Sequence, residues 1–98
     1  MHKYETMYIL NATQDDEAIA AQIEKYTKLI VDNGGAVEEV KSIGKKRMAY
    51  AIQKMNDGYY VQVNFSASAE VPAELERNFK NDEMCLRYLT VRLDEKNA

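Results

Sequence analysis

Residues 36–66, AVEEVKSIGKKRMAYAIQKMNDGYYVQVNFS, decide the fold, because two strand patterns follow each other there. Large apolar side chains recur at every second position over residues 48–52, and apolar residues alternate with polar ones over residues 59–65. This period is typical of a strand with one buried face. Asp57-Gly58 lies between the two patterns and is a strong signal for a hairpin turn. We therefore expect two antiparallel strands joined at Asp57-Gly58.

The upstream half of the first of these strands is irregular. Val37, Val40 and Ile43 recur at intervals of three, which breaks the two-residue period, and Gly44 follows them directly. A glycine inside a strand pattern often marks a bulge or a sharp bend. We expect the strand to bend near Gly44.

Toward the N-terminus the sequence predicts a strand and then a helix. The even-numbered positions of KYETMYIL, residues 3–10, carry no charge, so we expect them to face the core. In residues 11–35, Asp15, Asp16 and Glu17 lie where a first helical turn begins, and Gly34-Gly35 supplies the end. Carboxylates at a helix start favour the positive end of its dipole, a far commoner role than metal binding.

Toward the C-terminus a second helix and a last strand are expected. Ser68 is a plausible N-cap, and Pro72 is tolerated in the first turn, where backbone N–H groups lack helical partners anyway. An apolar stripe at helical spacing follows, formed by Val71, Leu75 and Phe79. LRYLTVRL, residues 86–93, then reads as a strand that is apolar on both faces.

The expected order is β-α-β-β-α-β, which is the ferredoxin-like α+β pattern. We expect one domain over residues 1–98, with a four-stranded antiparallel sheet in spatial order 4-1-3-2 and two helices on one face. The second strand would then lie at an edge of the sheet. The uncovered face is expected to present several side chains of the first and third strands, which are Lys3, Glu5, Met7, Ile9, Tyr60, Gln62 and Asn64. Apolar residues on an uncovered face suggest a docking surface.

Charge is distributed unevenly along the chain. The 98 residues have a formal net charge of -3, yet residues 41–54 carry five basic residues and no acid. The other 84 residues carry 8 basic and 16 acidic groups. Segregated charge of this kind can form a local anion site on an acidic body. The basic residues of the segment are Lys41, Lys45, Lys46, Arg47 and Lys54.

Catalytic and metal-binding classes find little support in the sequence. His2 is the single histidine and lies at a terminus, whereas a general base needs fixed geometry. Cys85, the single cysteine, lacks a histidine partner and is expected to be a small core residue. We expect no cofactor, no metal and no small-molecule substrate. No run is apolar enough for a signal peptide or a membrane span, so the cytoplasm is the expected compartment.

The basic segment allows more than one interpretation. Lysines protect exposed strand edges from pairing, and they also bind phosphates. Lys45-Lys46-Arg47 directly after Gly44 favours phosphate binding slightly, since a bent strand would project three cations together. Base stacking on the sheet, as in RNP motifs, is the minority interpretation. Asp57, Tyr60 and Val61 depart from that motif.

Over nearly its whole length the chain resembles the family of the bacterial small-subunit ribosomal protein number six, the "S six" protein. The resemblance is carried by KYE at residues 3–5, GKKRMAYAI at 44–52, YYVQVNF at 59–65, FKND at 79–82 and LRYLTVR at 86–92. It implies a ferredoxin-like fold and a role in assembling the central domain of the small-subunit ribosomal RNA. It also implies a heterodimer with the small basic ribosomal protein number eighteen.

The resemblance also implies RNA-binding positions, which are Lys3, Tyr4, Lys45, Lys46, Arg47, Tyr50, Lys54, Arg87 and Arg92. The cations are expected to contact phosphates, while Tyr4 and Tyr50 could equally belong to the core. Two residues depart from the family pattern. His2 stands where arginine is frequent, and Ala51 stands where a proline usually follows the AY pair.

The second strand is also the expected docking edge for the protein partner, near Val40, Ile43 and Met48. For Met48, burial in the domain's own core is an equal alternative. Two other functions stay open. One is a homodimeric module that binds a small effector, and the other is a protein-docking module without RNA contact.

Overall fold

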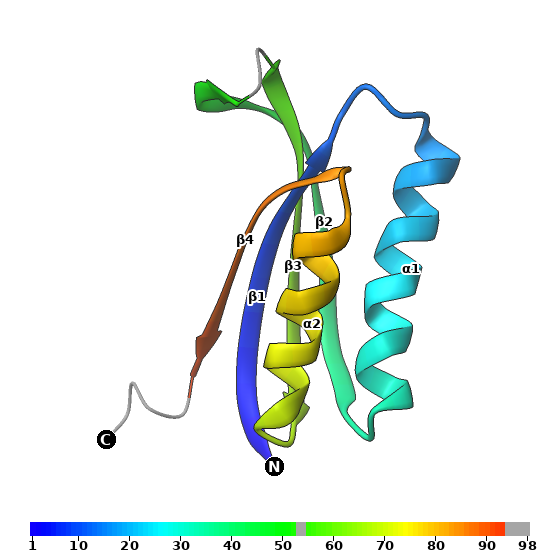
Figure 1. The fold of residues 1–98 in the computed structure, drawn as a ribbon, viewed down its shortest axis with the longest axis vertical. Coiled ribbons are helices and arrows are strands. Elements are labelled where there is room, and N and C mark those ends of the chain that lie inside the picture. The colour runs from blue at the N-terminus through cyan, green and yellow to red at the C-terminus, as the bar shows by residue number, and fades with distance from the viewer. Residues whose placement is uncertain (53–54, 94–98) are drawn as a thin grey trace.

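The computed structural model describes the backbone of residues 1–52 and 55–93, and the side chains of residues 1–47 and 57–93. The predicted order of elements is confirmed (Figure 1). The elements are β1 (His2–Asn11), α1 (Asp16–Asp32), β2 (Ala36–Ile52), β3 (Met55–Ala67), α2 (Glu70–Asn81) and β4 (Cys85–Arg92). Within these described ranges no helix is both long and apolar enough to cross a membrane.

The four strands form one antiparallel sheet in the order β2-β3-β1-β4. This order confirms the prediction that β2 lies at an edge. Both helices cover the same face of the sheet, so the opposite face has no helix over it (Figure 1). We call that opposite face the open face.

The core lies between the sheet and the helices. The even-numbered residues between positions 4 and 10 of β1 are buried as predicted, and they pair with odd-numbered residues of β3, for example Tyr4 with Phe65. The apolar stripes of both helices are buried against them. Phe79 of α2 lies at the centre of an aromatic cluster, with its ring centroid 4.5 Å from that of Tyr26, 4.9 Å from that of Tyr8 and 5.3 Å from that of Tyr88. This cluster joins α1, α2, β1 and β4.

The helix ends confirm one prediction and correct another. The Asp15 carboxylate accepts the Ala18 N–H at 2.8 Å, and Gly34, with φ of +86°, follows the end of α1. Ser68, however, is not the N-cap of α2, because the cap residue is Ala69. The Ser68 hydroxyl instead donates to the Glu70 carboxylate at 3.1 Å. Ser68 therefore stands one position too early for its oxygen to accept the amides that begin the helix.

The predicted hairpin turn at Asp57-Gly58 is wrong. Asp57 pairs with Arg47, and Gly58 pairs with Lys46, so both lie inside β3. The two strands remain paired as far as Ile52 and Met55. Gly58 also pairs with Asn11 of β1, so its backbone is held in the sheet from both sides and cannot form a turn. The paired strands consequently extend beyond the end of β1, and we call residues 45–52 and 55–58 the arm.

The predicted bend at Gly44 is confirmed. The β2–β3 register shifts between Ser42 and Gly44, and Gly44 has φ of +103°. A second shift lies between Val37 and Glu39. Each shift inserts one residue into β2. After each insertion, the odd-numbered and even-numbered residues exchange the faces of the sheet to which they point.

Candidate nucleic-acid interface

Three cations of the arm follow the bulge directly. Lys45, Lys46 and Arg47 are all exposed, and the arm that carries them leaves the plane of the sheet (Figure 1). Among the described residues none of the three forms an ion pair. The acid nearest in register is Asp57, which stands opposite Arg47. The arm therefore presents positive charge that the described side chains leave largely uncompensated.

The register distributes these cations over both sides of the arm. Lys46 stands on the side continuous with the open face, since Gly44 pairs with Tyr60 and Lys46 follows two positions later. Lys45 and Arg47 face the other way. Two other predicted RNA-binding residues of this segment cannot be placed. Lys54 and the Tyr50 side chain lie outside the described residues.

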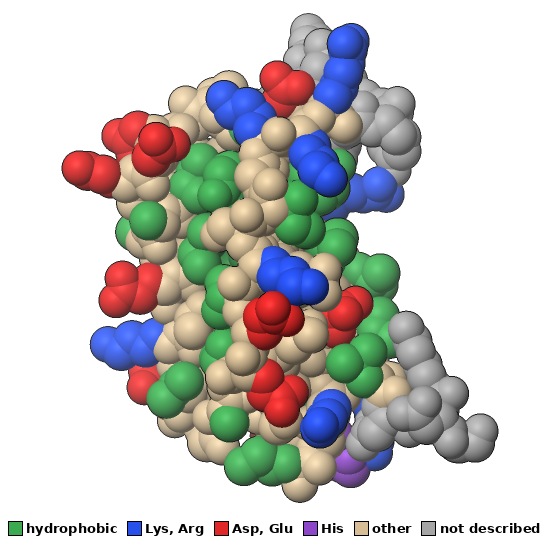
Figure 2. All heavy atoms as spheres, turned by 180° about the vertical axis from the view of Figure 1, so that it is seen from behind, with side chains coloured by type: hydrophobic (Ala, Val, Ile, Leu, Met, Phe, Trp, Pro, Cys, Tyr) green, Lys and Arg blue, Asp and Glu red, His purple; other side chains and the backbone are tan. Residues whose placement is uncertain are grey.

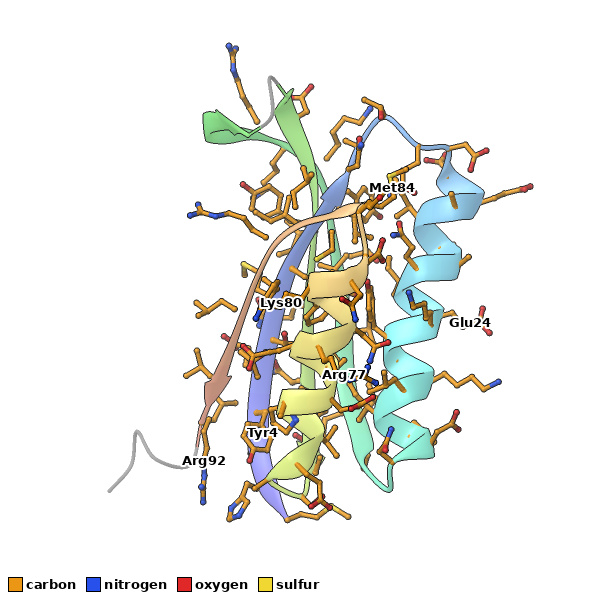
Figure 3. All side chains as sticks on the ribbon, in the orientation of Figure 1. Tyr4, Glu24, Arg77, Lys80, Met84 and Arg92 are labelled. Carbon is orange, nitrogen blue, oxygen red and sulfur yellow. The ribbon has the colours of Figure 1, made fainter. Side chains whose placement is uncertain are left out.

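The remaining predicted cations lie at two different ends of the sheet. Arg87 pairs with Ile9 near the arm. Lys3 and Arg92 lie at the other end, where the Arg92 guanidinium is 2.6 Å from the His2 ring nitrogen Nδ1 (Figure 3). The structure thus brings Arg87 toward the arm and keeps Lys3 and Arg92 away from it.

Tyr4 is a core residue. Its side chain is only 6% exposed, and its ring stacks on Phe65 at a centroid distance of 5.5 Å. Little of the side chain remains for contact with RNA. The sequence could not decide this point, because Tyr4 satisfied both the strand alternation and the family pattern.

The predicted partner-binding residues lie along the β2 edge. Val40 is 39% exposed and Ile43 is 36% exposed, which is high for aliphatic side chains. Val40 pairs with the buried Val63, so it faces the helices and not the open face. There it lines a groove of about 490 Å³ between α1 and β2, together with Ile23 and Val31. The Met48 side chain lies outside the described residues.

The open face beside the arm holds a cluster that sequence reasoning did not assign. Cross-strand pairing aligns Gly44, Tyr60, Ile9 and Arg87 in one row across all four strands. Next to this row is a groove of about 320 Å³ lined by Met7, Ile9, Arg87, Tyr88 and Leu89. Figure 2 shows basic side chains gathered over the upper part of this face, with apolar surface between them. Alternation along β3 indicated that Tyr60 is on this face, but only the strand register reveals its neighbours.

Burial is the main influence on three titratable groups of the interior. Burial, and then the nearby charge of Asp82, raise the pKa of the Cys85 thiol to about 12, so it stays protonated near neutral pH. Burial is also the main reason that the pKa values of Tyr8 and Tyr26 are raised. Among the described side chains, no cluster of three or more His, Cys, Asp or Glu residues could hold a metal ion.

Comparison with known proteins connects this geometry to a family. The family model described as "Ribosomal protein S6" matches residues 3–92. The small ribosomal subunit protein bS6 of Clostridium acetobutylicum is 43% identical over 95 residues, covering 97% of this chain and 100% of that protein. The bS6 protein of Moorella thermoacetica is 44% identical over 96 residues, covering 98% of each.

A solved structure agrees with the sequence matches. The crystal structure of 30S ribosomal protein S6 from Thermotoga maritima superposes with a TM-score of 0.91 at 26% sequence identity. The alignment covers 98% of this chain and 91% of that one. The chain belongs to the ribosomal protein S6 family, a family of small-subunit ribosomal proteins of the cytoplasm and not an enzyme family.

Proposed function

We propose that this protein is a structural component of the small ribosomal subunit that binds the central domain of the small-subunit ribosomal RNA. Membership of the family supports the setting. The observation that carries the RNA contact is the exposed triplet Lys45, Lys46 and Arg47, which projects from an otherwise acidic protein. Cations that are not neutralised by carboxylates can replace the counterions of a phosphate backbone.

These contacts position the protein on RNA and carry little sequence information by themselves. Arg87 would extend the contact from the arm across the open face. Lys3 and Arg92 would form a second contact region at the opposite end of the sheet. Lys54 and Tyr50 remain proposed members of the first region.

The partner that we propose is the small basic ribosomal protein number eighteen, bound as a heterodimer. The charge of this chain supports such a partner, because a protein of net charge -3 is repelled by RNA outside its basic segment. A basic partner supplies the missing charge. Its proposed docking site is the β2 edge, where Val40 and Ile43 are exposed beside unpaired backbone groups.

Replacing Lys45, Lys46 and Arg47 together with alanine should weaken binding of the heterodimer to central-domain RNA without unfolding the protein. Each lost phosphate contact should reduce the steepness of log K against log salt by about 0.9 if the site is duplex-like, as for B-form DNA. A filter-binding assay over a series of salt concentrations measures this slope.

A matched control removes two lysines and one arginine from the helices, as Lys28, Lys80 and Arg77 to alanine. The control lowers the net charge equally but should leave the slope close to that of the wild type. If the arm variant keeps the wild-type slope, the arm does not bind phosphate. In that case its lysines only protect a strand edge, as a protein-docking module without RNA contact would require.

Docking of the partner should protect the β2 edge from hydrogen exchange. We expect backbone amides of residues 37–48 to exchange quickly in the free protein and slowly in the heterodimer, since an edge strand has one unpaired row of N–H groups. The amides of β4, the other edge strand, serve as the internal control. Protection that rises only along the helices would place the interface elsewhere.

A further inference from the structure

The open face next to the arm carries an aromatic side chain, an apolar surface and cations. Tyr60 lies in the middle of the row that pairs Gly44, Tyr60 and Ile9. Paired residues of an antiparallel sheet point their side chains to the same face. Tyr60 is partly exposed, and the apolar residues Met7 and Leu89 continue the surface toward β4, where Leu89 is 65% exposed.

Gly44 leaves the β2 position opposite Tyr60 without a side chain. A Cβ placed on Gly44 would have no atom within 4 Å. The β2 position opposite Tyr60 is therefore open, and a flat ligand could approach the ring from that side.

Three cations border this area. On this face of β2, Lys46 is the next residue after Gly44 and Lys41 is the one before it. Arg87 of β4 pairs with Ile9 and so lies in the same row as Tyr60. Two acidic side chains of the open face interact with neighbouring side chains. Glu39 lies 3.8 Å from the Lys41 ammonium, so these two charges offset each other, and Glu5 accepts from the Gln62 amide at 3.0 Å. Phosphate contacts beside Tyr60 would therefore come from Lys46 and Arg87.

We propose that this surface binds an unpaired RNA nucleotide, with its base against Tyr60 and the Met7–Ile9–Leu89 groove and its phosphates beside Lys46 and Arg87. The proposal rests on the RNA-binding function proposed above and adds a base contact to it. Single strands are the expected ligand, because duplex bases already stack on one another and cannot present a face to a protein ring.

The test is a titration of the isotope-labelled full chain, followed by NMR, with two RNA probes. One probe is a short single-stranded adenylate oligonucleotide, and the other is a blunt RNA duplex of similar length. The single strand should shift the amides of Tyr60, Ile9 and Lys46 and the ring signals of Tyr60. The duplex should shift only the arm residues.

Two substitutions separate the ring from the fold. Tyr60→Leu keeps apolar bulk but removes the ring, and should raise the dissociation constant for the single strand about fivefold or more. Tyr60→Phe keeps the ring and should bind as the wild type does. Unchanged backbone spectra of both variants away from residue 60 establish that each is folded.

Each contrary result has a definite meaning. If the duplex shifts the arm while neither probe affects Tyr60, the base site is wrong and the phosphate-binding arm stands. If neither RNA shifts the arm or the open face, the base site is overturned, and the function proposed for the heterodimer is decided by the salt-dependent filter-binding assay. If the basic partner protein shifts the Tyr60 surface and the oligonucleotide does not, the open face is a protein interface and the base site is overturned.

Discussion

Replacing Phe79 with alanine is expected to lower the free energy of unfolding by about 3–5 kcal/mol. The Phe79 side chain is 1% exposed, and its ring contacts Tyr8, Tyr26 and Tyr88 from three other elements. Removing it leaves a cavity that the surrounding rings cannot fill without giving up their contacts with one another. A domain of this size has a total stability of roughly 5–15 kcal/mol, so the variant should be close to unfolding.

Urea unfolding followed by circular dichroism measures this loss. The midpoint should fall strongly, with little change in the dependence on urea concentration. Val31→Ala on the exposed side of α1 is a suitable control and should have an effect within about 0.5 kcal/mol of zero. A loss for Phe79→Ala as small as that of the control would mean that the aromatic cluster does not hold the helices on the sheet.

Replacing Asp82 with alanine is expected to lower the stability by about 2–3 kcal/mol, because hydrogen bonds to a charged group are among the stronger ones. Asp82 follows α2, and its carboxylate accepts the Tyr26 hydroxyl, the Gln22 amide at 2.9 Å and the Met84 N–H at 2.9 Å. The Lys25 ammonium lies 3.7 Å away. One side chain thus ties the end of α2 to α1 and to the segment before β4.

A double-mutant cycle with Tyr26→Phe tests this network. The loss caused by Tyr26→Phe should be smaller when Asp82 is already alanine, since the shared hydrogen bond is lost only once. Asp32→Ala, at the exposed end of α1, is the control and should combine additively with Tyr26→Phe. Additive losses for Asp82 and Tyr26 would show that their hydrogen bond contributes nothing.

The same carboxylate predicts a dependence on pH. Burial by itself would raise the pKa of Asp82, but hydrogen bonds from Tyr26, Met84 and Gln22 and the charge of Lys25 hold it below its ordinary value. A carboxyl with a lowered pKa stabilises the fold fully above the unfolded-state value near 4 and loses this contribution as the pH falls through the folded-state value. Urea unfolding at pH 3 to 7 should show a steeper acid loss for the wild type than for Asp82→Asn.

Much of the fold could be predicted because its signals are local. The even face of β1, the apolar stripe of α2 and the stop at Gly34 each depend on a few neighbouring residues, and all are confirmed. The edge position of β2 followed from the connectivity of the elements. The single-domain organisation of residues 1–98 stays a prediction.

The wrong prediction of the hairpin turn depended on distant pairing. Asp57-Gly58 has turn chemistry, but β1 holds Gly58 in the sheet, and β1 is remote in sequence. The period of three in β2 has the same kind of origin. One residue inserted between Val37 and Glu39 reverses the facing of β2, so Val37 and Val40 both face the helices although one number is odd and the other even. No local pattern specifies where such insertions fall.

The positive charge of the candidate site could be predicted from the sequence, but the arrangement of its residues on the sheet could not. The cations of the arm are visible in the sequence as an acid-free segment. Their division between two sides, and the row that joins Gly44 to Tyr60, Ile9 and Arg87, depend on the register of all four strands. Family resemblance could not place Tyr4 either, because a buried tyrosine and an RNA-facing one look alike in sequence.

The pairing of β1 with β4 determines how the protein would respond to mechanical force. Tyr4 pairs with Arg92, and the Leu93 N–H donates to the Lys3 carbonyl at 2.8 Å, so the outer ends of the first and last strands lie together. Pulling these two ends apart would load the hydrogen bonds of that ladder one after another, as in a zipper, and not all at once, as in shear. β4 should therefore peel away at low force, starting at Leu93. The Arg92–His2 contact and the hydrogen bond between the Thr6 and Thr90 hydroxyls would break first, and the aromatic contact between Tyr88 and Phe79 would be the next obstacle.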